Sequence, residues 1–331
     1  MQKSSKLKDH WLLSAIVLSG CAALGYELLW TRLLALVLGG EVLGILGVLA
    51  GFFGGMVLGA YFLSERASRS QTPLVDFMRL EAIAAIYGVI SPFLIYGLSI
   101  FLPRYLGPVA GDNNSFSALF LTVLIAGLVL LPATFCIGAN FAYLVEARRR
   151  LFSKQKKGAN MGRVYAANTL GATLGVLGSV YWVMPQLGLA WSGLFFAGIG
   201  GWSILLVGYW RKKHQATWAL RNQVVDSPPI STKEVAPTAS TNHLLLLLLV
   251  TGLAAIGLEI VVVHLFKQIL QNTIYTFANI LAVYLLGTAL GAWWYQGWEQ
   301  KKSSKRKKKK SKAKGVSAAA KKKTTVWSPL L

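Results

Sequence analysis

The sequence predicts an all-α, polytopic transmembrane helical bundle of about eight helices, and three observations support this fold class. The chain is 54% hydrophobic and 14% charged, with a mean hydropathy of +0.52, whereas soluble domains carry about a quarter charged residues. Eight apolar runs are long enough to cross a bilayer. Part of the sequence also recurs late in the chain, as in membrane proteins built from duplicated helix sets.

The expected spans follow one another along the chain, and each has the roughly 20 apolar residues that a bilayer requires. They cover residues 11–38, 41–63, 80–102, 116–144, 162–184, 189–210, 243–270 and 272–298. Of the 34 Lys and Arg residues, 31 lie in every second connecting segment, namely 1–10, 64–79, 145–163, 211–242 and 299–331. The positive-inside rule therefore predicts a multi-pass protein of the cell (inner) membrane with both termini cytoplasmic.

The internal repeat relates residues 20–60 to residues 252–292 without a gap, with 13 of 41 positions identical. Six helices precede the second copy, and an even number predicts that the two copies have the same orientation in the membrane. The expected organisation is a six-helix unit (1–210), a cytoplasmic linker (211–242), a two-helix partial repeat (243–298) and a disordered basic tail (299–331). The tail is too rich in lysine to form a core.

Two carboxylates occupy matched positions in the repeat, Glu27 and Glu259. A carboxylate within a span is costly and usually faces a partner or an aqueous cavity. We therefore expect these residues to bind a cation or a proton; the alternative is a structural role through bonds to neighbouring helices. Polar residues considered as partners of this site are Tyr26, Arg32, His264, Lys267 and Asn168.

Other polar and small residues in the spans favour helix packing. Four asparagines lie within the expected spans, and buried amides commonly bond between helices: Asn140, Asn168, Asn272 and Asn279. The glycines that are expected to allow close helix approach are Gly51, Gly54, Gly55, Gly59, Gly171, Gly175 and Gly178. The sequence around Cys21 has the form of a lipoprotein cleavage site, but the apolar run continues to Gly39, which favours an uncleaved helix.

Three motifs resemble the membrane-integral spermidine-synthase-like proteins, also described as fused major-facilitator/spermidine-synthase proteins. They are GYELLWTRLLALVLGG (25–40), LPATFCIGANF (131–141) and GRVYAANTLGATLGVLGSV (162–180). In that family, the helices are typically followed by a soluble Rossmann-like aminopropyltransferase-type domain. This chain departs from the pattern at the lysine-rich tail. The resemblance therefore implies the membrane portion without the catalytic domain.

The implied function is the binding or transport of small cationic amines, and aminopropyl transfer by this chain alone is not expected. The alternatives are a major-facilitator-like secondary transporter fragment and a truncated, non-functional copy. No cofactor, metal site or nucleic-acid partner is expected, since the four histidines are isolated in the sequence. The expected partners are the lipid bilayer, anionic headgroups at the basic segments, a separate soluble aminopropyltransferase-like protein and a second copy of the chain.

Overall fold

The computed structural model describes residues 2–38, 41–106, 116–151, 157–214, 239–270, 274–295 and 297–298. Across these ranges the chain is helical and contains no strand, which confirms the all-α prediction. Most of the expected linker (residues 215–238) and the whole expected tail (299–331) lie outside the described residues. The proposed division into domains therefore remains a prediction.

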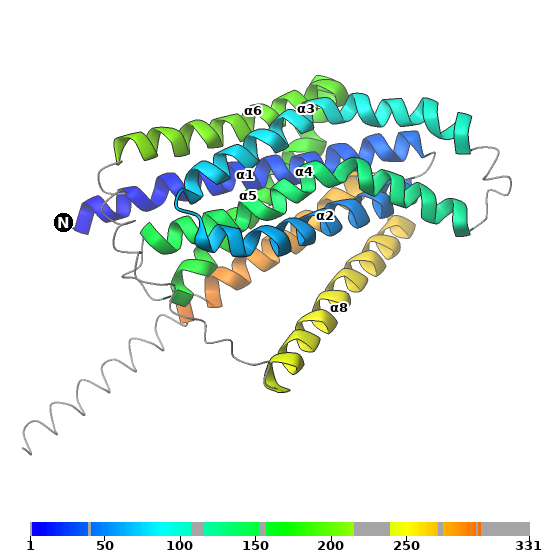
Figure 1. Ribbon diagram of the computed structural model, residues 1–331. Helices are drawn as coiled ribbons and strands as arrows, with labels where there is room; N and C mark the ends of the chain where they lie inside the picture. Colours follow the sequence, from blue (N-terminus) through cyan, green and yellow to red (C-terminus); the bar gives the residue numbers. More distant parts are fainter. Residues whose placement is uncertain are drawn as a thin grey trace, which may run out of the picture.

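Long helices lie side by side and form a bundle (Figure 1). α1 lies within this bundle and contacts α2, α3, α5 and α6. The helices are α1 (Gln2–Val37), α2 (Glu41–Arg69), α3 (Pro73–Leu106), α4 (Phe116–Leu151), α5 (Lys157–Gly178), the π-helical turn η1 (Ser179–Val183), α6 (Met184–Lys213), α8 (Ala239–Ile269) and a further helix at Ile274–Tyr295.

Six stretches within the described residues are long and apolar enough to cross a membrane. One of them, Gly162–Lys213, has 52 residues, which at ~1.5 Å per residue would be about 78 Å long if straight. The chain instead turns back near the start of α6 (Figure 1), at Gly188, which has a φ of 73°. This left-handed conformation suits glycine, and the turn divides the stretch into the two spans expected from the sequence. The six stretches indicate a membrane protein.

Glycines on α2 allow it to pack closely against α4, as the sequence predicts. A Cβ atom at Gly55 would lie 1.9 Å from the hydroxyl oxygen of Thr134, and one at Gly59 would lie 1.9 Å from the carbonyl oxygen of Phe135. Gly51 similarly approaches the backbone of Gly127. These contacts confirm the packing role of three glycines on α2. The same prediction is wrong for Gly54, because its exposed position has no neighbouring atom within 4 Å.

The α1–α5 contact uses the same principle. A Cβ at Gly171 would lie 2.0 Å from the carbonyl oxygen of Val17, and one at Gly175 would lie 2.2 Å from that of Cys21. Cys21 thus lies inside a continuous helix, α1, which is the arrangement that the sequence favours over a cleavage site. Gly178 has no atom within 4 Å, so the packing prediction is wrong there.

The second copy of the repeat forms α8 and the helix Ile274–Tyr295, and these two helices differ in how much of their apolar surface packs against the bundle. Phe277 and Leu281 are buried in a cluster with Leu28 of α1 and Val176 of α5. α8 diverges from the bundle in Figure 1. The side chains of its run 244–250 are more than half exposed, so much of this helix has apolar surface without protein contact.

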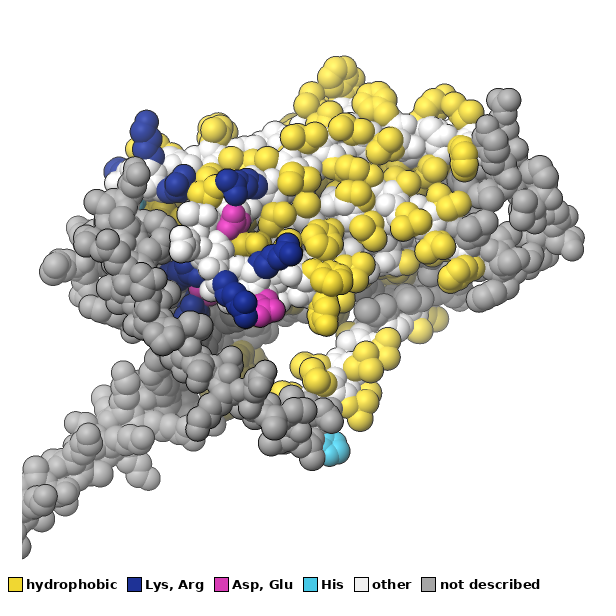
Figure 2. All heavy atoms as spheres, viewed as in Figure 1, with side chains coloured by type: hydrophobic (Ala, Val, Ile, Leu, Met, Phe, Trp, Pro, Cys, Tyr) yellow, Lys and Arg dark blue, Asp and Glu magenta, His cyan; other side chains and the backbone are white. Residues whose placement is uncertain are grey.

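Charged side chains gather at one end of the visible face, and apolar side chains cover most of the remainder (Figure 2). Near the C-terminal end of α4, Glu146 accepts hydrogen bonds from Arg149 (2.7 Å) and Arg150 (2.6 Å). The Arg150 guanidinium also donates to the Ser68 carbonyl of α2 at 3.0 Å. Such a polar end beside an apolar band is the surface that a membrane-spanning bundle requires.

Candidate functional site

The signature residues Tyr26 and Trp30 join α1 to α3. Their rings stack with centroids 5.3 Å apart, and both side chains are buried. The Trp30 indole donates a hydrogen bond of 2.7 Å to the Ser91 hydroxyl. The Tyr26 ring lies against Gly88, where a Cβ would come within 2.2 Å of it. These two positions of the signature therefore act in helix packing.

Glu27 lies on the same stretch of α1 and is only 3% exposed. Its backbone carbonyl accepts a hydrogen bond from Thr31 at 2.7 Å. Arg32, five residues further along the helix, is partly exposed. The predicted carboxylate is thus buried inside an apolar span, His10–Val37. This position fits both roles considered for Glu27, cation binding and a structural bond between helices.

Of the other predicted partners, the structure places the side chain of Asn168. Asn168 of α5 lies against Gly20, where a Cβ would be 2.4 Å from the Asn168 carbonyl oxygen. Gly20 precedes Glu27 by about two helical turns, roughly 10 Å along the helix. The second-copy residues Glu259, His264 and Lys267 belong to α8, but their side chains lie outside the described residues. A shared Glu27–Glu259 site therefore stays a prediction.

The structure contains a second buried carboxylate in the spans, Glu81, and sequence reasoning did not select it. Glu81 is 5% exposed and lies ~12 Å along α3 from the first residue of that helix. Its Oε2 atom accepts a hydrogen bond of 2.9 Å from the Ser19 hydroxyl of α1. The same atom accepts a bond of 2.6 Å from the Asn140 side-chain amide of α4. We call Glu81, Ser19 and Asn140 the Glu81 cluster.

The sequence signal that could have identified Glu81 is a carboxylate at the edge of an expected span. The expected third span began at residue 80, which placed Glu81 at the membrane boundary next to Arg79. α3 instead begins at Pro73, so Glu81 lies two turns inside the helix. The expected interhelical role of Asn140 is confirmed by its bond to Glu81. Asn279 also forms an interhelical bond, because its Oδ1 accepts a hydrogen bond of 2.9 Å from the Tyr181 hydroxyl, but this residue is exposed and not buried. Asn272 lies outside the described residues.

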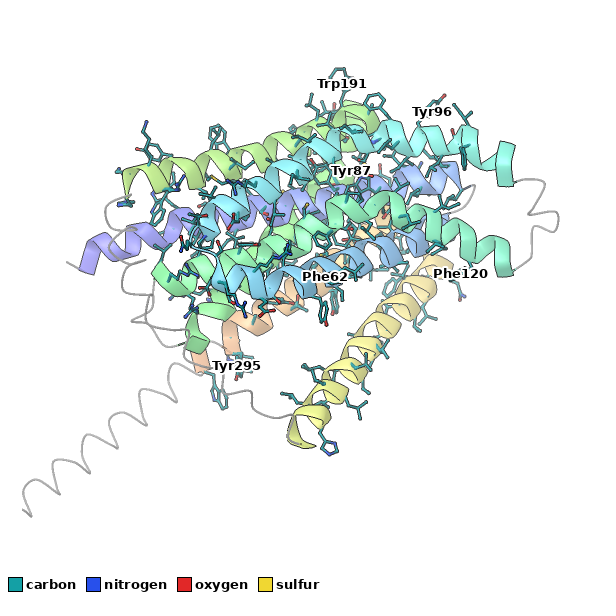
Figure 3. All side chains as sticks on the ribbon, in the orientation of Figure 1. Phe62, Tyr87, Tyr96, Phe120, Trp191 and Tyr295 are labelled. Atoms are coloured by element: carbon teal, nitrogen blue, oxygen red, sulfur yellow. The ribbon has the colours of Figure 1, made fainter. Side chains whose placement is uncertain are left out.

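Aromatic side chains distinguish the interior of the bundle from its surface. Tyr87 lies between helices in Figure 3 and donates its hydroxyl hydrogen to the Val129 carbonyl of α4. Four other labelled aromatics are at least 59% exposed: Phe62, Tyr96, Phe120 and Trp191. Exposed rings on helices of this hydropathy suit contact with lipid.

Comparison with known proteins gives one distant relationship. A stretch of 180 residues, 54% of this chain, is 27% identical to polyamine aminopropyltransferases of two Mycobacterium tuberculosis strains (CDC 1551 / Oshkosh and ATCC 25618 / H37Rv) and of Mycobacterium bovis. The match spans 31% of the length of each relative. No family model and no solved structure matches the chain. The similarity and the apolar helices are compatible with a membrane protein linked to polyamine metabolism.

Proposed function

We propose that this chain is an integral membrane protein that binds small organic cations of the polyamine class within its helical bundle. The observation that carries the proposal is the burial of Glu27, 3% exposed, in an apolar span of 28 residues. Intramembrane carboxylates are costly and commonly mark the pathways of substrates and ions. The distant similarity to polyamine aminopropyltransferases supports amines as the class of cation.

The chemistry of recognition follows from charge. A polyamine carries several ammonium groups on a flexible chain, and each ammonium donates hydrogen bonds that an ionised carboxylate accepts strongly. Glu27 would supply one such acceptor from α1, and the matched Glu259 would supply the other from α8. Two acceptors on different helices would suit a ligand with charges at both ends.

Calorimetry with spermidine on the detergent-purified full chain tests this proposal. We expect Glu27→Gln and Glu259→Gln each to weaken binding by at least about tenfold, equivalent to roughly 1.4 kcal/mol, because each amide removes the negative charge. Glu65→Gln is the control, since Glu65 is 71% exposed and pairs with Arg69 at 2.6 Å. The absence of spermidine binding by the parent chain, or unchanged affinity in both variants, would refute the proposal.

The proposed location is the cell membrane, crossed eight times, with both termini on the cytoplasmic side. It is supported by the alternation of basic segments along the sequence. Impermeant thiol labelling of Ser227→Cys and Asn114→Cys, in a background with Cys21→Ala and Cys136→Ala, tests it. Asn114→Cys should react from outside intact cells and Ser227→Cys should not. The reverse pattern would overturn the topology.

Transport is the second candidate function, and the parallel repeat favours it, because duplicated helix sets are characteristic of secondary transporters. Proteoliposomes that contain the purified chain and take up labelled spermidine would establish transport. Binding without uptake would instead support a role in binding alone.

A further inference from the structure

The Glu81 cluster is a second polar site, separate from Glu27 in the bundle. Three helices supply its hydrogen-bonding groups: Ser19 from α1, Glu81 from α3 and Asn140 from α4. A fourth helix, α6, approaches through Gly200, where a Cβ would lie 3.4 Å from Glu81 Oε1. The carboxylate is thus enclosed on all sides by apolar helices.

The cluster contains no basic group to balance the carboxylate. Within the described residues, Glu81 forms no ion pair with Lys, Arg or His. Its two donors are a neutral hydroxyl and a neutral amide, and both bind the same atom, Oε2. An ionised carboxylate buried in this way costs far more than two neutral hydrogen bonds return.

The cluster also has unused hydrogen-bonding capacity. Asn140 is 3% exposed, yet its Oδ1 atom has no hydrogen-bond partner in the described structure. The Tyr26 hydroxyl, equally buried, also lacks one. Tyr26 of α1 is an ionisable side chain near Glu81, while α4 contributes Asn140 and α6 contributes Gly200 to the surroundings of the carboxylate. Buried polar atoms in native structures are rarely left unpaired.

We infer that Glu81, Asn140 and Ser19 form an exchangeable site for one monovalent inorganic cation, either a proton or an alkali ion. Such a cation neutralises the carboxylate, which the surrounding helices do not. Because α6 presents Gly200 to Oε1, no side chain of that residue fills the space beside this atom. This site goes beyond the proposed amine binding.

The test is modification by dicyclohexylcarbodiimide, an apolar reagent that reacts with protonated carboxyl groups. The full chain in detergent is treated in mildly acidic and mildly alkaline buffers, with sodium chloride or choline chloride at equal ionic strength. Mass spectrometry then locates the label. Because the readout is at Glu81 of the unaltered chain, the result does not depend on the folding of a variant. Exposed Glu65 is the internal control.

The two supporting outcomes identify the cation. A proton site is identified if labelling of Glu81 decreases toward alkaline pH and is equal in sodium and choline. The decrease should be up to about tenfold per pH unit for one proton. Labelling that sodium suppresses several-fold relative to choline identifies an alkali-ion site. Absence of label at Glu81 in every buffer, or labelling that depends on neither pH nor sodium, would overturn the inference and leave Glu81 as a structural acceptor between helices.

A second measurement separates this site from the amine proposal. If the bound cation is a proton, infrared difference spectra of the chain at the two pH values should contain a carboxylic acid C=O band that Glu81→Gln removes and Glu65→Gln retains. Spermidine calorimetry on Glu27→Gln reports on the other site. If spermidine does not bind while the Glu81 band titrates, the amine proposal fails and the cation site stands.

Discussion

The two copies of the internal repeat place identical glycines in different surroundings. In the first copy, Gly55 and Gly59 of α2 lie so close to α4 that a Cβ atom at either position would overlap an oxygen atom at 1.9 Å. Their counterparts in the second copy, Gly287 and Gly291, are exposed and have no neighbouring atom within 4 Å. The same contrast holds between Gly20 and Gly252.

This contrast shows that small residues permit close helix packing but do not produce it. Glycine removes the side chain that would hold two backbones apart, and the attraction then comes from the dispersion contacts of the partner helix. α4 is that partner for α2. Within the described structure, the matched face of the helix Ile274–Tyr295 has no partner, so its glycines lie open.

The aromatic positions of the repeat differ as well. Tyr26 and Trp30 are buried between α1 and α3, but their counterparts are Leu258, which is 64% exposed, and Val262, which is partly exposed. In the first copy, the aromatic pair anchors α1 to Ser91 and Gly88. The second copy retains the carboxylate of the signature and lacks its anchors.

The largest effect should follow from placing a second-copy residue in the first copy. Trp30→Val removes a fully buried ring and its hydrogen bond to Ser91. Large-to-small changes of this kind cost about 3–5 kcal/mol. Thermal unfolding of the detergent-solubilised chain, followed by circular dichroism, measures the loss. Leu258→Ala is the control and should change the midpoint little; equal losses in the two variants would contradict the comparison.

A smaller effect should follow from adding one methyl group at matched glycines. Gly59→Ala forces α2 and α4 apart at a backbone contact, which costs about 1–3 kcal/mol through overpacking. Gly291→Ala adds the same methyl group where nothing lies within 4 Å, and alanine is the better helix former by about 1 kcal/mol. Thermal melts of the two variants should therefore shift in opposite directions. A loss of stability in Gly291→Ala would reveal a partner for that face.

The smallest effect should come from the contact between the two parts of the molecule. Tyr181→Phe removes the hydrogen bond to Asn279, which joins η1 to the helix Ile274–Tyr295. The site is exposed, so the loss should be about 0.5–1.5 kcal/mol at most. Hydrogen exchange of residues 274–295 should increase in this variant. Tyr61→Phe, at a residue that is 75% exposed, should leave that exchange unchanged.

The sequence predicted much of the fold because the hydropathy of a span is a local property. The boundary at Gly188 lay between two expected spans, and the packing roles of Gly55, Gly59, Gly171 and Gly175 followed from their spacing. The lack of a packing contact at Gly54 and Gly178 did not follow from spacing, since a glycine contacts a neighbouring helix only if it lies on the side of its own helix that faces it. The buried position of Glu27 agrees with its expected place inside a span.

By itself, the sequence determined that this is a helical membrane protein, because the bilayer requires long apolar helices and excludes charge from them. It also placed a carboxylate, Glu27, in α1. Only the tertiary structure decided that Glu81 is enclosed, since Ser19, Asn140 and Gly200 come from three other helices and lie between 59 and 119 residues away from it in the chain. Contacts over such separations depend on how whole helices pack, and no local pattern of residues records that packing.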